Sequence, residues 1–378
     1  MYIMENRDIY QQMLKNSNRD GVSMNSMNEI KVDKGFYTVY ELKRRFDAKE
    51  KRIVIDSEFQ REDVWSLNRK IELVESVLMG LPLPIFYFTQ DKYGRLIVVD
   101  GRQRLTALFE YMSDKYPLKK LKILPELNGK RFSKLSPLLQ SRIEDFQIQA
   151  HVIMPPTPDR IKFDIFERVN RGGVQLNKQE IRNALYQGKA TKLLGHIAGS
   201  NVFAKATGNA FVNEKRMKDR YLLTRFITFY LSGSGVIKND LGESYIYRDD
   251  IDEFLGKGLE SINHMSDYEV EAIGHTVIET LEKSYYYLGE DAFRMNRGIR
   301  KSPINMNVFE AVMWIMLYLP ESNTVIRSEV QTKVTEFINS DAFKNNIGNH
   351  RDSSVKLEWR LEQAENLGRK LRVDAEKN

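Results

Sequence analysis

The stretch from residue 96 to residue 112 constrains the fold of this chain more than any other. The apolar run Leu96–Val99 has the length and composition of a buried strand. Apolar residues then recur at helical spacing, at Leu105, Leu108, Phe109 and Met112. The pattern predicts a strand that turns directly into a helix, and hence a domain in which helices pack on a sheet.

The polar pentad Asp100-Gly101-Arg102-Gln103-Arg104 lies at that turn. The first amides of a helix have no intrahelical partner, and they carry the positive end of the helix dipole. Two guanidinium groups, an amide and a carboxylate at such a place suit a phosphate, with Asp100 placed to hold a metal or a water. A structural alternative stays open, because Asp100 as N-cap with Gln103 three residues on would form a capping box that needs no ligand.

The pattern along the chain predicts a mixed N-terminal part and a helical remainder. In the first part we expect strands at 53–55, 85–88, 96–99 and 148–154, with helices at 38–46, 102–112 and 158–169, and a helix capped by Asn68 that ends at Gly80. Later helices are expected at 191–198, 213–231, 249–256, 266–288, 303–319, 325–338 and 353–371. We therefore predict a mobile segment 1–28, an α/β domain 29–190 and a helical domain 191–378.

A second glycine-containing motif, Asn170-Arg171-Gly172-Gly173, ends the helix expected at 158–169. Two glycines permit positive φ and close backbone approach, and the simpler interpretation is a helix stop. The functional interpretation is that Asn170, Gly172 and Gly173 line the same ligand site as the pentad. Residues Asn177 to Glu180 predict a capping box for the next helix.

Composition excludes several chemistries. The chain has no cysteine, which removes disulfides, thiolate zinc sites and thiol nucleophiles, and its five histidines show no ligand spacing. No apolar stretch is long enough to span a membrane and no signal peptide is evident, so we expect a cytoplasmic protein. A formal charge of +6 permits contact with nucleic acid without requiring it.

Four motifs in the same order carry a family resemblance. They are Phe59-Gln60-Arg61 with Trp65, the step Leu81-Pro82-Leu83-Pro84, the stretch Val99 to Thr106 around the pentad, and Asn170 to Glu180. With these motifs the chain resembles, over roughly residues 35 to 190, the N-terminal domain family of GmrS/GmrD-type restriction systems, which act on modified DNA. That family is related to ParB and sulfiredoxin folds, and its pentad is usually written DGQQR.

The resemblance implies an α+β fold, with a ParB-like mixed-sheet domain followed by an all-helical domain. It also implies a nucleoside triphosphate site with Mg²⁺, used to regulate cleavage of modified phage DNA. Matching positions assign catalysis to Asp100, Gln103 and Arg104, and the metal to Asp100. Phosphate binding would fall to Arg61, Gly101, Arg102, Arg104, Asn170, Gly172 and Gly173.

Two departures from the family pattern qualify these expectations. Arg102 stands where relatives usually have glutamine. The arginine either strengthens phosphate binding or removes a hydrogen bond that orients the attacking water. Longer relatives continue into a His-Asn-His nuclease domain, and nothing after Ala190 offers its histidine cluster. We therefore expect a Mg²⁺-dependent NTPase acting as sensor, with any nuclease on a separate subunit. The alternative is a non-enzymatic ParB-like module that binds DNA.

Overall fold

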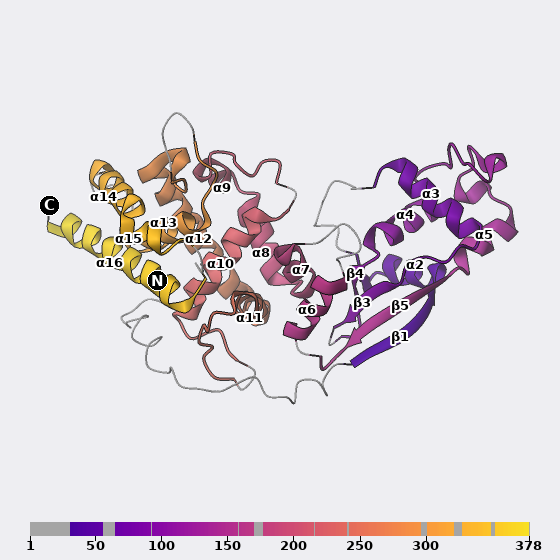
Figure 1. Ribbon diagram of the computed structural model, residues 1–378, viewed down its shortest axis with the longest axis horizontal. Helices are drawn as coiled ribbons and strands as arrows, with labels where there is room; N and C mark the ends of the chain where they lie inside the picture. Colours follow the sequence, from indigo (N-terminus) through magenta and orange to yellow (C-terminus); the bar gives the residue numbers. More distant parts are fainter. Residues whose placement is uncertain are drawn as a thin grey trace. The chain divides into compact units, whose positions relative to one another are not determined.

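A computed structural model describes residues 31–55, 65–91, 93–157, 159–169, 177–214, 216–239, 242–295, 301–320, 327–348 and 352–377 (Figure 1). The described chain falls into two compact units, which divide between Leu185 and Tyr186. The first unit contains a sheet and the second is helical, so the predicted α+β class is confirmed. The segment 1–28, predicted to be mobile, lies outside the described residues.

The first unit is built on a mixed five-stranded sheet in the order β1-β5-β3-β4-β2. β1 pairs antiparallel with β5 and β3 antiparallel with β4, whereas β3 with β5 and β2 with β4 are parallel. The elements of this unit are β1 (Lys31–Thr38), α2 (Val39–Asp47), β2 (Ile53–Val54), α3 (Leu67–Leu78), β3 (Phe86–Gln90), β4 (Leu96–Asp100), α4 (Arg102–Met112), η2 (Pro125–Leu127), η3 (Phe132–Lys134), α5 (Pro137–Glu144), β5 (Gln147–Met154), α6 (Asp159–Val169) and α7 (Lys178–Leu185).

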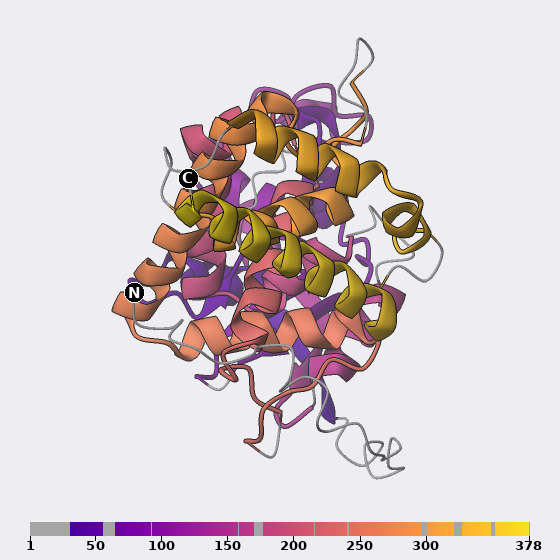
Figure 2. The same ribbon diagram turned by 90° about the vertical axis from the view of Figure 1, so that its left-hand side faces the viewer.

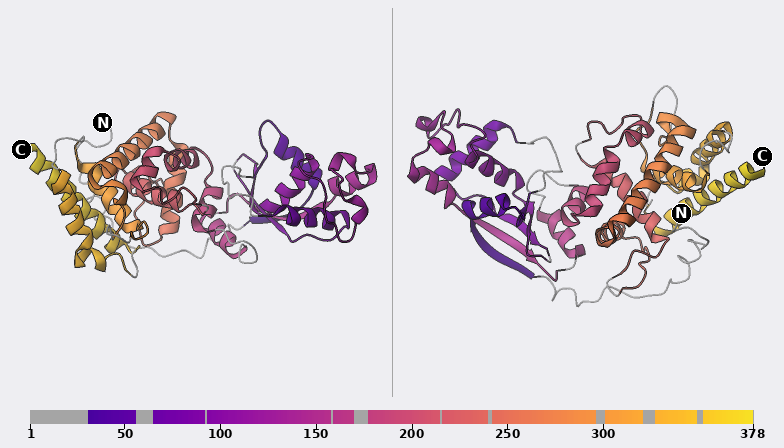
Figure 3. Two further views of the ribbon diagram at one scale, coloured as in Figure 1. Left: turned by 90° about the horizontal axis from the view of Figure 1, so that it is seen from above. Right: turned by 180° about the vertical axis from the view of Figure 1, so that it is seen from behind.

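Side-chain alternation gives the sheet two different faces. Phe86, Phe88 and Val98 point into the main core of the unit, beneath α2, α3, α4 and α5, which lie together on one side of the sheet (Figures 1 and 3). The intervening residues point the other way, where Val99 and Ile153 form a smaller core with α6 and α7. The faces of the sheet are therefore covered to different extents.

Local sequence explains where the helices of this unit begin and end. The side chain of Thr38 accepts from the Glu41 amide and caps α2. α3 is capped by Ser66 rather than by Asn68, so that prediction is wrong: Asn68 lies inside the first turn. The helix stops as predicted, because Gly80 adopts a φ of +75° just after it.

One strand and one α-helix of this unit were not predicted, nor were the short helices η2 and η3. β1 is mostly exposed, and its apolar residues are too few to produce an alternating pattern. α5 lies in a stretch that looked loop-rich, although Pro137 at its start is typical of a first helical turn. The predicted hairpin of β3 and β4 and the predicted strand β5 are confirmed.

The second unit is helical and has its own hydrophobic core. Its elements are α8 (Lys189–Ala198), α9 (Asn201–Ala206), α10 (Lys218–Ser232), α11 (Ile251–His264), α12 (Asp267–Leu288), η5 (Gly289–Asp291), α13 (Met306–Tyr318), α14 (Arg327–Asn339), α15 (Asp341–Asn345) and α16 (Ser354–Lys377). The almost fully buried α13 lies near the centre of this core, and α16 runs across the unit in Figure 2. None of the helices that the structure describes combines the length and the apolar composition needed to cross a bilayer.

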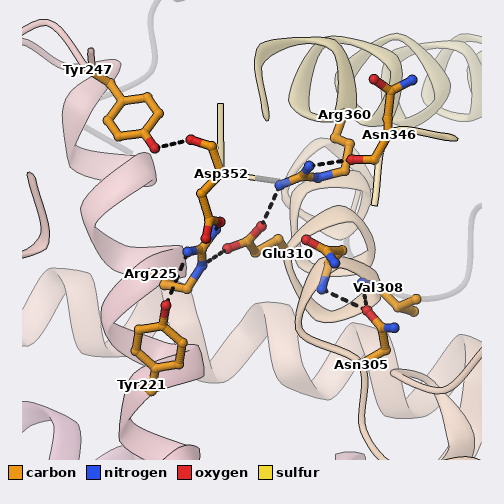
Figure 4. Close-up of polar contacts among 10 residues, drawn as sticks. Tyr221, Arg225, Tyr247, Asn305, Val308, Glu310, Asn346, Asp352 and Arg360 are labelled. Atoms are coloured by element: carbon orange, nitrogen blue, oxygen red, sulfur yellow. Dashed lines mark hydrogen bonds and ion pairs between the residues drawn. The ribbon is translucent and has the colours of Figure 1, made fainter. Parts of the chain in front are cut away.

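A buried ionic network joins three helices of this unit (Figure 4). Glu310 of α13 accepts from Arg225 of α10 through one carboxylate oxygen, and its other oxygen lies 3.4 Å from Arg360 of α16. Arg225 also pairs with Asp352 at 2.9 Å, and Arg360 donates to the Asn346 carbonyl at 2.7 Å. Burial lowers the pKa of Arg225, but Glu310 and the other partners more than offset this, so the pKa is raised and the group stays charged.

Candidate functional site

The pentad lies where β4 ends and α4 begins, as the sequence predicts. Asp100 is the last residue of β4, Gly101 is the N-cap and Arg102 opens α4. Leu105, Leu108 and Phe109 turn into the main core, which fixes the helix against the sheet. The pairing of β3 with β4 shifts between Tyr87 and Phe88, so that a β-bulge immediately precedes the motif.

Gly101 is required by both its conformation and its surroundings. Its φ of +97° lies in the left-handed region that side chains rarely adopt. A Cβ atom at this position would come within 2.1 Å of the Phe86 ring. The chain therefore turns from strand to helix through a residue that has to remain glycine.

The cap geometry overturns the capping-box alternative for the pentad. Gly101, and not Asp100, is the N-cap, and no cap side chain bonds to the first-turn amides of α4. The first intrahelical hydrogen bond runs from the Leu105 amide to the Gly101 carbonyl. The start of α4 thus keeps the positive dipole end and the donor amides that suit an anion.

Arg104 is buried and holds its neighbours together. Its guanidinium donates to Asp100 Oδ2 at 2.8 Å and to the carbonyls of Pro84 and Ile85. The same group lies 4.0 Å from the centre of the Phe86 ring. Burial lowers the Arg104 pKa, and the Asp100 carboxylate counteracts that shift. Arg104 therefore ties the end of β4 to the segment that enters β3.

Asp100 is the more accessible partner of this pair. Its side chain is 37% exposed, against 10% for Arg104. One carboxylate oxygen accepts from Arg104, which keeps the group oriented beside the first turn of α4. A partly exposed carboxylate held in this way can meet a cation or a water from solvent.

The remaining two residues of the pentad lie half-buried in the first turn of α4. The Gln103 side-chain oxygen is buried and has no hydrogen-bond partner. A buried acceptor without a donor costs free energy unless a water or ligand supplies the hydrogen bond. Arg102 adds a positive charge to the same turn. The first turn of α4 therefore combines the Arg102 guanidinium, the buried Gln103 oxygen and the positive end of the helix dipole.

Four predicted site residues lie outside the described part of the chain: Arg61, Asn170, Gly172 and Gly173. The structure begins again at Asn177, where the predicted capping box is confirmed. The Asn177 side chain accepts from the Gln179 and Glu180 amides at 2.9 Å, and the Glu180 carboxylate accepts from the Asn177 amide at 2.6 Å.

A buried polar group on α7 escaped the sequence analysis. Gln179, Arg182 and Asn183 are almost fully buried, on a helix that packs against β4. The Arg182 guanidinium lies 5.5 Å from the centre of the Phe163 ring, and the Asn183 side-chain oxygen has no hydrogen-bond partner. Their spacing of three and four residues places them on one helix face, which is the signal that would have revealed them.

The donor chemistry around Asp100 fits magnesium in a nucleotide site. Among the described residues, no group of three or more His, Cys, Asp or Glu side chains is placed to hold a metal ion. Magnesium, however, is usually held by one or two carboxylates together with waters and substrate phosphates. The accessible carboxylate of Asp100 is of this kind, and it adjoins the uncapped start of α4.

Comparison with known proteins gives one match. Residues 42–187 match the family described as the GmrSD restriction endonuclease, N-terminal domain. The matched range runs from α2 to just beyond α7 and includes the whole pentad. It indicates a component of a restriction system. No curated protein and no solved structure matches the chain.

Proposed function

We propose that this chain, whose residues 42–187 match the N-terminal domain family of the GmrSD restriction endonuclease, is the nucleotide-dependent sensor of a restriction system that acts on modified phage DNA. In this proposal the domain binds a nucleoside triphosphate with Mg²⁺ at the start of α4 and hydrolyses it. A separate nuclease subunit cleaves the DNA.

The observation that carries the proposal is the first turn of α4, which begins at a glycine N-cap. The turn has no side-chain cap, and the Gln103 oxygen beside it is buried without a partner. Helix amides favour an anion, whereas an amide oxygen accepts from a hydroxyl or a water. A triphosphate with its attacking water presents both kinds of group, and a simple anion does not.

Each residue of the pentad has a distinct part in this proposal. Arg102 and the first amides of α4 bind phosphate oxygens, while Gly101 lets the backbone approach them. Asp100 holds the magnesium ion, which when bound neutralises phosphate charge. Gln103 orients the water. Arg104 acts as a positioning residue, because its guanidinium fixes the carboxylate of Asp100.

The four residues outside the described chain stay within the proposal. Arg61 and Asn170 contribute further phosphate contacts, and Gly172 and Gly173 supply backbone amides. Arg102 decides how binding and hydrolysis are balanced, since relatives usually carry glutamine there. A guanidinium strengthens the hold on phosphate, whereas a glutamine amide can both accept and donate to a water.

Thermal unfolding of the full chain tests the binding step. With ATP, GTP, CTP or UTP at a hundred times Kd and Mg²⁺ present, the bound nucleotide stabilises the native state by about 2.7 kcal/mol. Asp100→Ala abolishes the Mg²⁺-dependent part of the shift. Asp47→Ala, which removes an exposed carboxylate from the end of α2, leaves the shift intact. A chain that shows no shift with any nucleotide is not a nucleotide sensor.

Phosphate release by the same variants tests hydrolysis. Asp100→Ala and Gln103→Ala lower the rate by about a hundredfold or more, because each loses a group that acts on the water or the metal. Arg102→Gln, which restores the usual residue, weakens binding and raises the rate. If wild type and Asp100→Ala release phosphate equally, the activity comes from a contaminant.

A further inference from the structure

Among the described residues, the part of the second face of the sheet that β1 and β5 form is largely exposed. The smaller core formed with α6 and α7 covers this face only around Val99 and Ile153. Alternation along β1 and β5 places Val32, Lys34 and Phe36 on this face, with Gln149 and His151 beside them. In the described structure Val32, Lys34, Phe36 and Gln149 are exposed and His151 is half-buried. We call these five residues the open face.

Strand register arranges the open face in rows. Phe36 lies opposite Gln149, and Lys34 lies opposite His151. Directly opposed residues bring their Cβ atoms to within about 5.5 Å, so these side chains are neighbours. His151 is in turn paired with Tyr87 of β3, and Tyr87 with Asp100 of β4. The second row therefore runs across the sheet from Lys34 to the residue that opens the pentad.

Three residues of these rows carry aromatic rings: Phe36, His151 and Tyr87. Phe36 is 65% exposed, although a phenyl ring on a strand normally finds cover. Tyr87 and His151 meet edge to face, with ring centroids 5.3 Å apart and an interplanar angle of 90°. A sheet surface that presents aromatic rings between polar side chains offers stacking surfaces to planar ligands.

The open face carries one positive charge, which favours an anionic ligand. Lys34 is the charged residue at the positions of β1, β5 and β3 that share this face, where the sequence places no carboxylate. Asp33 points to the opposite face, because neighbouring strand residues alternate. The chain as a whole carries a formal charge of +6. Aromatic rings with a lysine between them suit nucleobases joined by phosphates.

We propose that the open face binds single-stranded nucleic acid. One base stacks on Phe36, a second lies against His151 and Tyr87, and Lys34 contacts the phosphate between them. A duplex is disfavoured, because its bases are already stacked on one another and cannot stack on the aromatic side chains. This site is distinct from the proposed nucleotide site, although the row from Lys34 to Tyr87 leads toward it.

Fluorescence anisotropy of the full chain with a fluorescein-labelled 20-mer of deoxythymidine tests the proposal, without nucleotide. Phe36→Ala and Phe36→Leu weaken binding by about fivefold to a hundredfold, since base stacking on an aromatic ring is lost. Phe36→Trp keeps binding at the wild-type level, because tryptophan also offers a ring for stacking. If apolar area alone mattered, Phe36→Leu would bind as well as Phe36→Trp. Tyr93→Ala, at the turn after β3, removes an equally exposed aromatic ring and leaves binding unchanged.

Three results would overturn the proposal: equal binding by Phe36→Leu and wild type, tighter binding of a duplex of the same length, or a change confined to oligomeric state. The last, measured by light scattering, would assign the open face to a second copy of the chain. The nucleotide-dependent thermal shift of Phe36→Ala stays at the wild-type value. Failure of this site and failure of the nucleotide site are therefore separate outcomes.

Discussion

At the scale of the residue, Gly101 determines the geometry of the pentad. Its left-handed conformation lets β4 turn into α4 without a linker, and the absence of a side chain leaves room for the Phe86 ring. Phe86 in turn packs against the Arg104 guanidinium. A side chain added at position 101 would thus displace Phe86 and, through Arg104, disturb the carboxylate of Asp100.

We expect Gly101→Ala to lower the free energy of unfolding of the first unit by about 2–4 kcal/mol. Urea unfolding measures this loss as a lower midpoint. About 1–2 kcal/mol comes from the left-handed conformation, and overpacking against Phe86 adds the rest. Gly80→Ala is the matched control, because its φ of +75° carries the conformational cost but no atom lies within 4 Å of the added Cβ. Equal losses in the two variants would show that contact with Phe86 is unimportant.

At the scale of the element, the buried ionic network holds α16 to the rest of the helical unit. Arg225, Glu310 and Arg360 come from three helices, and each is almost fully buried. Two arginines share one glutamate, and Asp352 supplies the second negative charge. Burying such charges is costly, but removing one of them leaves the others without compensation.

We therefore predict that Glu310→Gln destabilises the helical unit by about 3–5 kcal/mol, because two buried guanidinium groups lose a counter-charge. Glu336→Gln on α14 breaks an exposed pair with Lys333 and should cost at most about 1 kcal/mol. Chemical unfolding followed by circular dichroism measures both. A loss below 1 kcal/mol for Glu310→Gln would mean that the network contributes little to stability.

At the scale of the whole molecule, the chain contains two compact units with separate cores. We expect the effects of Gly101→Ala and Glu310→Gln to add within about 0.5 kcal/mol in the double variant, because the two residues belong to different compact units. Calorimetry of the wild type, both single variants and the double variant measures the coupling. A coupling energy above 1 kcal/mol would show that the two sites interact energetically.

Much of the fold could be predicted from the sequence, because local patterns decide most of its elements. The hairpin of β3 and β4, the helical face of Leu105, Leu108 and Phe109, and the box at Asn177 all depend on residues close in the chain. β1 was missed, because an exposed strand needs no apolar pattern. Asp100 was weighed as a cap because spacing cannot reveal that Gly101 turns left-handed.

The environment of Arg104 could not be predicted, since its partners Pro84 and Ile85 are distant in sequence. Two arginines two residues apart looked equivalent. Packing buries Arg104 and leaves Arg102 half-buried, and only coordinates separate these environments. Whether the pentad binds a nucleotide stays a prediction.

The burial of Arg104 has a consequence for how this motif can diversify. Replacing Gly101 or Arg104 disturbs the backbone or leaves buried carbonyls without donors, so both positions tolerate little variation. Arg102 lies half-buried in the same first turn of α4. The framework that holds the carboxylate of Asp100 in place therefore depends on positions 101 and 104, and a substitution at either one is felt by the whole pentad.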